Sequence, residues 1–244
     1  TDDIVIGHDS VDLNAGLSTT SGDIQLQATG TVTIGDQRRV IAGGVGTSLS
    51  IEASDINVGA GTAMDATIQN LANGSVTLLA TSGSVALNQY GIESGSGTVL
   101  IDARSGGIST NVTAVPTEIL TAGHVELDAT TIGSVGSRLD LEGATSLVIT
   151  DTGAGNIHLG QADAVTVNST TITVEGANFG DINVALDRDT DNIAILDGHQ
   201  ITEARHTDGR FEYNAVVGDI RLGEIETGNA DIVLVASDGA ILDT

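Results

Sequence analysis

The chain contains 244 residues, of which 33 are Asp or Glu and only eight are basic, so its formal net charge at pH 7 is −25. This excess of negative charge repels nucleic-acid phosphates and anionic membrane surfaces, which argues against both as partners. The chain has no Cys, which excludes disulfides and thiolate metal sites. It also lacks a run of 18 apolar residues, so no membrane insertion is predicted.

A five-residue pattern recurs along the chain: a hydrophobic residue, any residue, a hydrophobic residue, any residue, and then alanine. Such alternation predicts a strand with one buried face. From Leu49 to Val125 the copies start about 25 residues apart, a spacing typical of solenoids, propellers and other repeat arrays. The copies are VDLNA (11–15), IQLQA (24–28), LSIEA (49–53), VTLLA (76–80), VLIDA (99–103), VELDA (125–129) and IVLVA (232–236).

Most copies are followed by a short corner and a second short strand pattern. TVTIG follows the copy at 24–28, SDINVG follows the copy at 49–53, and SDGAILD follows the copy at 232–236. Between about 139 and 176 the strand patterns become shorter and lie closer together, as in NIHLG (156–160). No segment between them has a helical period, so the chain is predicted to be all-β.

Two all-β architectures fit this pattern. A sandwich requires hairpins, but the Asn-Gly and Asp-Gly turns do not fall regularly between paired strands. A parallel β-solenoid (β-helix) with about 20–27 residues per coil stacks equivalent residues on one another, and it is the preferred prediction. It predicts three interior columns: Ile24, Leu49, Val76, Val99 and Val125; Leu26, Ile51, Leu78, Ile101 and Leu127; and Ala28, Ala53, Ala80, Ala103 and Ala129.

Residues 1–244 are predicted to form a single continuous solenoid segment with two departures from the repeat. Residues 113–122 contain Pro116, the only proline, and are expected to bulge out of a coil. Residues at about 176–215 hold three of the four aromatic side chains and are expected to form a less regular insertion or irregular coils. The chain opens and closes in mid-pattern, which suggests a piece of a longer protein or a mature product.

Several phrases resemble the filamentous haemagglutinin type of repeat. They are GDIQLQATGTVTIG (22–35), GTVLIDARSGGI (97–108), GNIHLGQADAVTV (155–167) and GDIRLGEIETGNADIVLVASDGAILD (218–243). The resemblance implies a right-handed parallel β-helix. It also implies a place in large bacterial surface or secreted adhesins, where such repeats are mainly rods and stalks, and hence a location outside the cell or on the bacterial surface.

The sharpest candidate for a metal site is DRDTDN (187–192). Asp187, Asp189 and Asp191 have the alternate spacing with which a calcium loop begins. The Gly and Glu of a complete EF-hand are replaced by Asn192 and Gly198, so a solvated turn is the competing interpretation. The predicted fold requires no cofactor, and Ca²⁺ is the one candidate.

The composition shift at 176–215 allows two interpretations. The aromatic side chains could cover an exposed rung of the solenoid, or the segment could form a surface that binds a host or matrix glycan or protein. The residues of this candidate partner surface are Phe179, Arg205, Arg210, Phe211 and Tyr213.

Enzymatic activity is the weaker hypothesis. Asp181, Asp187, Glu203 and Asp208, near His206, could supply a pair of carboxylates, but carboxylates are common throughout so acidic a chain. Polysaccharide-cleaving clefts usually present basic or aromatic side chains, which are scarce here. The sequence therefore predicts a non-enzymatic rod or stalk of an adhesin-like protein, with end-to-end self-association into filaments as a further hypothesis. A carbohydrate-binding or polysaccharide-cleaving β-helix is the alternative.

Overall fold

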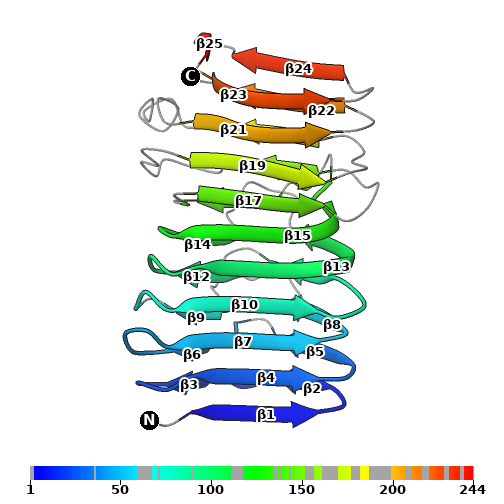
Figure 1. The fold of residues 1–244 in the computed structure, drawn as a ribbon. Helices are drawn as coiled ribbons and strands as arrows, with labels where there is room; N and C mark the ends of the chain where they lie inside the picture. Colours follow the sequence, from blue (N-terminus) through cyan, green and yellow to red (C-terminus); the bar gives the residue numbers. More distant parts are fainter. Residues whose placement is uncertain are drawn as a thin grey trace.

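The chain folds into parallel strands stacked in successive coils (Figure 1). The computed structural model describes residues 3–35, 37–59, 68–70, 72–88, 91–110, 118–134, 137, 139–142, 144, 146–151, 157–160, 170–176, 182–186, 199–206, 210–215, 220–227, 231–236 and 239–243. In the strands that span Glu142 to Ile232 it describes the backbone. The described strands form one parallel β-solenoid with no helix, as predicted.

The first row of strands lies along the front of the molecule in Figure 1. Each of its strands pairs in parallel with the strand one coil away. The row consists of β1 (Ile4–His8), β4 (Ile24–Ala28), β7 (Ser48–Ala53), β10 (Ser75–Ala80), the first parts of β13 (Val99–Thr110) and β15 (His124–Ile132), β17 (Ser146–Asp151), β19 (Thr170–Gly176), β21 (His199–His206), β23 (Ile220–Thr227) and β25 (Ile241–Asp243).

Two further rows complete the coils. The second row consists of β2 (Val11–Leu13), β5 (Thr31–Ile34), β8 (Asp55–Val58), β11 (Val85–Leu87), the last parts of β13 and β15, β18 (Ile157–Gly160), β20 (Ile182–Leu186), β22 (Arg210–Ala215) and β24 (Asp231–Ala236). The third row consists of β3 (Leu17–Thr19), β6 (Val40–Ala42), β9 (Ile68–Asn70), β12 (Ile92–Ser94), β14 (Ile119–Thr121) and β16 (Leu139–Glu142).

The cross-section of the coil changes at β16. This strand pairs with β14 of the third row through Ile119 and Leu141, and with β18 of the second row through Leu139 and Leu159. The last described strand of the third row, β16, is therefore paired directly with β18 of the second row. From β18 onward the described strands alternate between the first and second rows.

The observed register confirms the three predicted interior columns. Ile24 is opposite Leu49, Leu49 opposite Val76, Val76 opposite Val99, and Val99 opposite Val125. The columns through Leu26 and Ala28 follow the same register two and four residues further along each strand. All fifteen side chains are buried, so the prediction of stacked aliphatic columns is confirmed.

The winding is right-handed. In Figure 1 the chain runs from left to right along the front, returns behind, and rises with each coil. The offset between stacked partners ranges from 20 residues (Ile4 to Ile24) to 30 (Thr173 to Glu203), slightly wider than the predicted 20–27. Two copies of the pentapeptide, at 11–15 and 232–236, lie in β2 and β24 of the second row rather than in the first.

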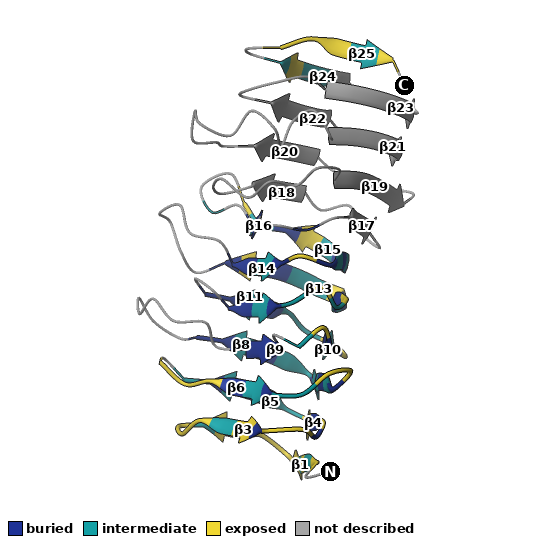
Figure 2. Ribbon diagram, turned by 90° about the vertical axis from the view of Figure 1, so that its left-hand side faces the viewer, coloured by how far each residue is buried: buried dark blue, intermediate teal, exposed yellow. Residues whose placement is uncertain are grey.

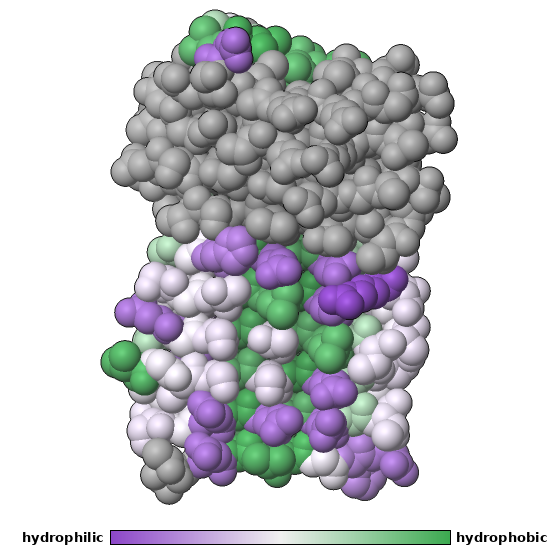
Figure 3. All heavy atoms as spheres, viewed as in Figure 1, coloured by the Kyte–Doolittle hydropathy of each residue, from purple (hydrophilic) through white to green (hydrophobic). Residues whose placement is uncertain are grey.

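Alternating burial follows from the strand geometry, because successive side chains point to opposite faces. In β4 the two Gln side chains are exposed, while Ile24, Leu26 and Ala28 are buried. The core of the described coils is thus a continuous aliphatic cluster enclosed by the three rows (Figure 2). Viewed from the front, hydrophilic residues flank a more hydrophobic central band in the described coils (Figure 3). Leu79 and Leu100, which alternate with the inward residues of β10 and β13, are half-buried.

Strands β20, β21 and β22 of the segment at about 176–215 continue the first and second rows in parallel register. The pairing of β19 with β21 contains a register shift between Ile172 and Thr173. Residues 177–181, 187–198 and 207–209, on which most of the predicted insertion falls, lie outside the described residues. The first part of the predicted bulge at 113–122 lies outside them as well, whereas Ile119–Thr121 form β14 of the third row.

A column of glycines marks the corner that leads into the first row. A Cβ atom on Gly97 would lie 1.8 Å from the carbonyl oxygen of Gly74, and one on Gly123 would lie 2.0 Å from that of Gly97. A Cβ atom on Gly74 would likewise meet the carbonyl oxygen of Thr47. Glycine is required here because each corner packs its backbone directly on the coil below.

Substitution of Gly97 tests this close stacking. We expect Gly97→Ala to lower the free energy of unfolding by about 1–3 kcal/mol, because the added methyl group forces two coils apart. Gly7→Ala is the matched control, since a Cβ on Gly7 meets nothing within 4 Å. Chemical denaturation measures both variants, and equal stability of the two would contradict the stacking argument.

Candidate functional site

The most regular polar feature of the described coils is a set of carboxylates that join one coil to the next, here called the carboxylate staples. Each lies immediately before the first inward residue of a strand. A side-chain oxygen of each accepts the backbone N–H of the equivalent residue one coil later. The four pairs are Asp3 with Asp23 (3.0 Å), Asp23 with Ser48 (2.7 Å), Asp55 with Ser84 (2.9 Å), and Glu118 with Asp140 (2.7 Å).

The staples occur at all three corners of the coil. Asp3 and Asp23 lie before strands of the first row, Asp55 begins a strand of the second row, and Glu118 precedes a strand of the third. A serine forms the equivalent hydrogen bond at one position, where Ser84 Oγ accepts the N–H of Gly107 at 3.1 Å. The side chain thus satisfies an amide at a corner, beyond the regular ladder of the strands. The Gly-Asp-Ile phrase at 22–24 is the sequence signal for such a staple.

Other polar side chains also link successive coils. Gln27 Nε2 donates to Glu52 Oε2 at 3.1 Å, and Gln69 donates to Glu93 on the facing strand. Buried Asn70 donates from Nδ2 to the carbonyl oxygen of Thr47, 3.0 Å away in the coil below. These contacts use amide and carboxylate groups to hold neighbouring coils in register.

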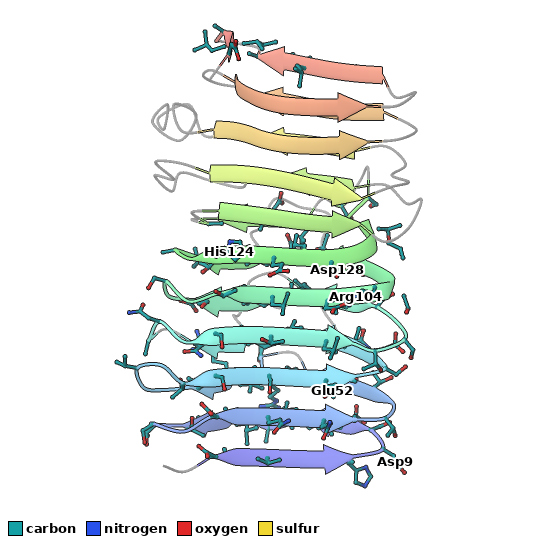
Figure 4. All side chains as sticks on the ribbon, in the orientation of Figure 1. Asp9, Glu52, Arg104, His124 and Asp128 are labelled. Carbon is teal, nitrogen blue, oxygen red and sulfur yellow. The ribbon has the colours of Figure 1, made fainter. Side chains whose placement is uncertain are left out.

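An ion-pair cluster lies at the corner between the first and second rows (Figure 4). Arg104 contacts Asp128 through Nε at 2.8 Å and Asp102 through a terminal nitrogen at 3.1 Å. The Arg104 side chain is 66% exposed, whereas that of Asp128 is 9% exposed. Asp102 and Asp128 are direct register partners on β13 and β15, so one guanidinium separates two stacked carboxylates.

The pKa shifts of the two partners of this ion pair have different main causes. The hydrogen bond from Arg104 to Asp128 raises the pKa of the guanidinium, as expected for a pair that favours the charged form. The pKa of Asp128 is nevertheless above its ordinary value, because burial disfavours its charge more than Arg104 restores it. Asp128 Oδ1 is buried without a hydrogen-bond partner, which agrees with this order of effects.

Glu118 is the most perturbed carboxyl among the described residues. The residue is 1% exposed, and burial raises its pKa to about 8. Its Oε1 accepts from the hydroxyl of Thr110 at 2.7 Å, and its Oε2 accepts from the backbone N–H of Asp140 at 2.7 Å. Both donors lower the pKa, but they do not offset the cost of removing the charge from water.

An open groove of about 540 Å³ runs along the corner near β1. It is lined in part by His8, Asp9, Gln27 and Glu52, so hydrogen-bonding and acidic groups face it (Figure 4). No sequence motif marks this groove, because His8 and Glu52 are 44 positions apart (8 to 52) and come to line one groove only when coils stack. Its chemistry suits a polar or cationic ligand.

Some of the candidate site residues predicted from the sequence lie in described strands, and others lie outside the described residues. Asp187, Asp189 and Asp191 of the candidate calcium loop, and Phe179 of the candidate partner surface, lie outside the described residues, as do Asp181 and Asp208. Arg205 and Glu203 are in β21, and Arg210, Phe211 and Tyr213 are in β22.

Register aligns the two aromatic residues of β22 with apolar residues of the neighbouring strands. Phe211 is opposite Ile182 and Ile232, and Tyr213 is opposite Val184 and Leu234.

The two arginines of the candidate partner surface have acidic register partners. Arg205 is opposite Glu226, and Arg210 is opposite Asp231.

Within the described ranges, no three His, Asp or Glu side chains are grouped so that they could hold a metal ion. The same part of the chain contains no helix of the length and apolar character needed to cross a membrane. Comparison of the chain with protein-family models, with curated proteins and with solved structures found no match.

The staple at Asp55 can be tested by a pair of substitutions. Asp55→Ala removes the acceptor of the Ser84 N–H, and we expect it to lower the free energy of unfolding by about 1–2 kcal/mol. Asp55→Asn keeps a side-chain carbonyl oxygen and should retain most of the stability. Asp12→Ala, at an exposed position of β2, is the control for the loss of one negative charge. Denaturant titration compares the three, and equal losses for Asp55→Ala and Asp55→Asn would contradict the staple.

The ion-pair cluster predicts that the loss of stability caused by Arg104→Ala depends on pH. Without the guanidinium the pKa of Asp128 rises further above its unfolded value. The cost of ionising Asp128 in the folded state is therefore absent in acid and grows as the pH rises. We expect the unfolding temperature of Arg104→Ala to fall further below that of the wild type at pH 7 than at pH 4. Arg38→Ala, at an exposed corner, should show no such divergence.

Proposed function

We propose that this chain is a structural segment of an extracellular rod or stalk, and that it acts by extending and holding its shape rather than by catalysis. One observation carries the proposal: side-chain hydrogen bonds repeatedly join residues one coil apart, at all three corners. Asp3, Asp55 and Glu118 exemplify these contacts. The polar groups that an enzyme would gather in one cleft are here distributed along the length of the coils.

The mechanism of such a rod is mechanical. Neighbouring coils are held together by a backbone ladder on each row and by buried aliphatic columns, and the staples join several of the described coils at their corners. Strands in such a stack lie about 4.8 Å apart, so each added coil lengthens the rod by about the same step. The net charge of −25 keeps neighbouring rods apart and soluble.

The resemblance to filamentous haemagglutinin-type repeats supports an adhesin-like protein at the bacterial surface or secreted from it. Repeats of that type are mainly rods that carry other modules away from the cell. The chain accordingly belongs, on this proposal, outside the cell. End-to-end association of copies into filaments is a further part of the proposal.

The polar groove near β1 favours a second candidate function, the binding of a glycan or another polar ligand. His8, Asp9, Gln27 and Glu52 offer both donors and acceptors of hydrogen bonds. A glycan array probed with the wild type and with Glu52→Ala tests this candidate, and a blank array would remove it. Turnover of acidic or neutral polysaccharides would instead favour the cleaving alternative, with Glu203 among its candidate residues.

Calcium binding at Asp187, Asp189 and Asp191 is proposed separately. Oxygen ligands at alternate positions would relieve charge repulsion by sharing one hard cation. An unfolding temperature that is unchanged by EDTA would remove this proposal without affecting the rod.

Deletion of one whole coil tests the rod. Val76 and Val99 are register partners, so removing residues 76–98 joins Ser75 directly to Val99 and keeps the alternation of faces. We expect this variant to unfold cooperatively and its rod to be shorter by about 4.8 Å, one strand spacing. Circular dichroism and small-angle X-ray scattering measure the two properties.

The matched control is a deletion one residue shorter, 76–97. It puts Thr98 in the inward position and moves the following apolar residues to the outer face. We expect this variant to be strongly destabilised. Equal stability of the two deletions would contradict the modular rod, and electron micrographs of the wild type at high concentration distinguish filaments from single rods.

A further inference from the structure

Glu118 lies at the place where the architecture of the solenoid changes. It immediately precedes β14, and its staple partner Asp140 lies in β16, the last described strand of the third row. Beyond β16 the described strands alternate between two rows. Glu118 therefore connects the three-row part of the solenoid with the coil at which the two-row part begins.

The contacts of Glu118 span three successive coils. Its backbone oxygen accepts the N–H of Ile92 at 3.0 Å, and its own N–H donates to the carbonyl oxygen of Asp140 at 3.0 Å. Its carboxyl then contacts Asp140 again and the hydroxyl of Thr110. One residue thus holds the coil below, its own coil and the coil above.

The other staples are more exposed than Glu118. Asp3 and Asp23 are exposed and Asp55 is half-buried, whereas Glu118 is enclosed. The donors that reach its carboxyl, the Thr110 hydroxyl and the Asp140 amide, are both neutral. Among the described residues, the titratable group that faces it is Asp140, whose charge has the same sign. The described contacts from β12 and β13 come from Ile92 and Thr110, which do not titrate.

A protonated Glu118 fits this environment. The Asp140 N–H still donates to one carboxyl oxygen, and the Thr110 hydroxyl can turn to accept the carboxyl proton. An ionised Glu118 must instead remain as a buried charge, held by two neutral donors beside a second carboxylate.

We propose that Glu118 is a proton-dependent clamp at this joint of the solenoid. When its carboxyl is protonated, the coil of β16 is held on the coil of β14. When it is ionised, the buried charge costs more free energy than its two hydrogen bonds return, and the joint loosens. The rod would then be most firmly locked in mildly acidic surroundings and would become easier to open as the pH rises.

The direction follows from proton linkage. The pKa of Glu118 is about 8 in the folded chain and near its ordinary value of 4.5 when unfolded. Below pH 4.5 both states hold the proton, so Glu118 contributes no pH dependence. Between 4.5 and about 8 the folded state alone retains it, and stability falls as the pH rises. At the upper end the folded-to-unfolded ratio is lower by up to about a thousandfold.

The test compares thermal unfolding of the full chain and of Glu118→Gln from pH 5 to pH 9. Glutamine keeps an acceptor for the Asp140 N–H and a donor for Thr110, but it cannot ionise. We expect the two unfolding temperatures to be close at pH 5 and to diverge by pH 9, with Glu118→Gln the more stable. Glu126→Gln, on the outer side of β15, should track the wild type. Parallel curves for wild type and Glu118→Gln would overturn the clamp.

A second measurement covers the case in which Glu118→Gln does not fold. The Glu118 carboxyl carbon of the wild type is titrated by ¹³C NMR. A midpoint above pH 7 supports the clamp, and a midpoint below pH 5 overturns it. Neither outcome depends on whether the rod belongs to an adhesin-like protein.

Discussion

Every other property of this chain depends on in-register parallel stacking. Because each strand pairs with its equivalent one coil away, residues 20 to 30 positions apart, as in Ile4 to Ile24 and Thr173 to Glu203, become nearest neighbours. A residue therefore contacts similar residues above and below it, and any chemical property is repeated as a column. The aliphatic columns supply the core, and the glycine column at Gly74, Gly97 and Gly123 allows the corners to approach.

Stacking also explains how a chain so rich in carboxylates remains folded. Like charges at facing positions repel, and in-register stacking tends to create such pairs. The chain relieves them by hydrogen-bonding carboxylates to backbone amides, as at Asp23 and Asp55, or by placing a cation between them, as Arg104 does between Asp102 and Asp128. At Glu118 the repulsion is relieved in a third way, because burial raises the pKa of its carboxyl and favours the neutral form.

The way the polar contacts are distributed along the described coils supports the proposed function. A site for catalysis concentrates perturbed groups in one place, whereas here the polar contacts recur at each corner and their energetic effect is to hold coils together. The rod proposed above uses that effect directly. The groove near β1 is the local exception, because Asp9 and Glu52 line an open depression, where Glu52 also accepts a hydrogen bond from Gln27 of the neighbouring coil.

The sequence alone was sufficient to predict the strands, their inward faces and their stacking, because period-two alternation and a repeat near 25 residues together specify a parallel coil. The columns through Ile24, Leu26 and Ala28 were predicted residue by residue for this reason. The candidate calcium loop and Phe179 stay predictions, and the aromatic residues of β22 took their register positions only from the structure.

What only the tertiary structure decided is which polar residues meet. The offset between coils varies, so the partner of a given carboxylate cannot be counted off along the chain. Glu118 and Asp140 carry no motif that links them, and the change from three rows to two at β16 has no marker in the repeat. Alternation is a local property of a strand, and it is therefore readable from sequence. Burial and charge environment are set by loop lengths and by neighbours one coil away, and they exist only once the coils have stacked.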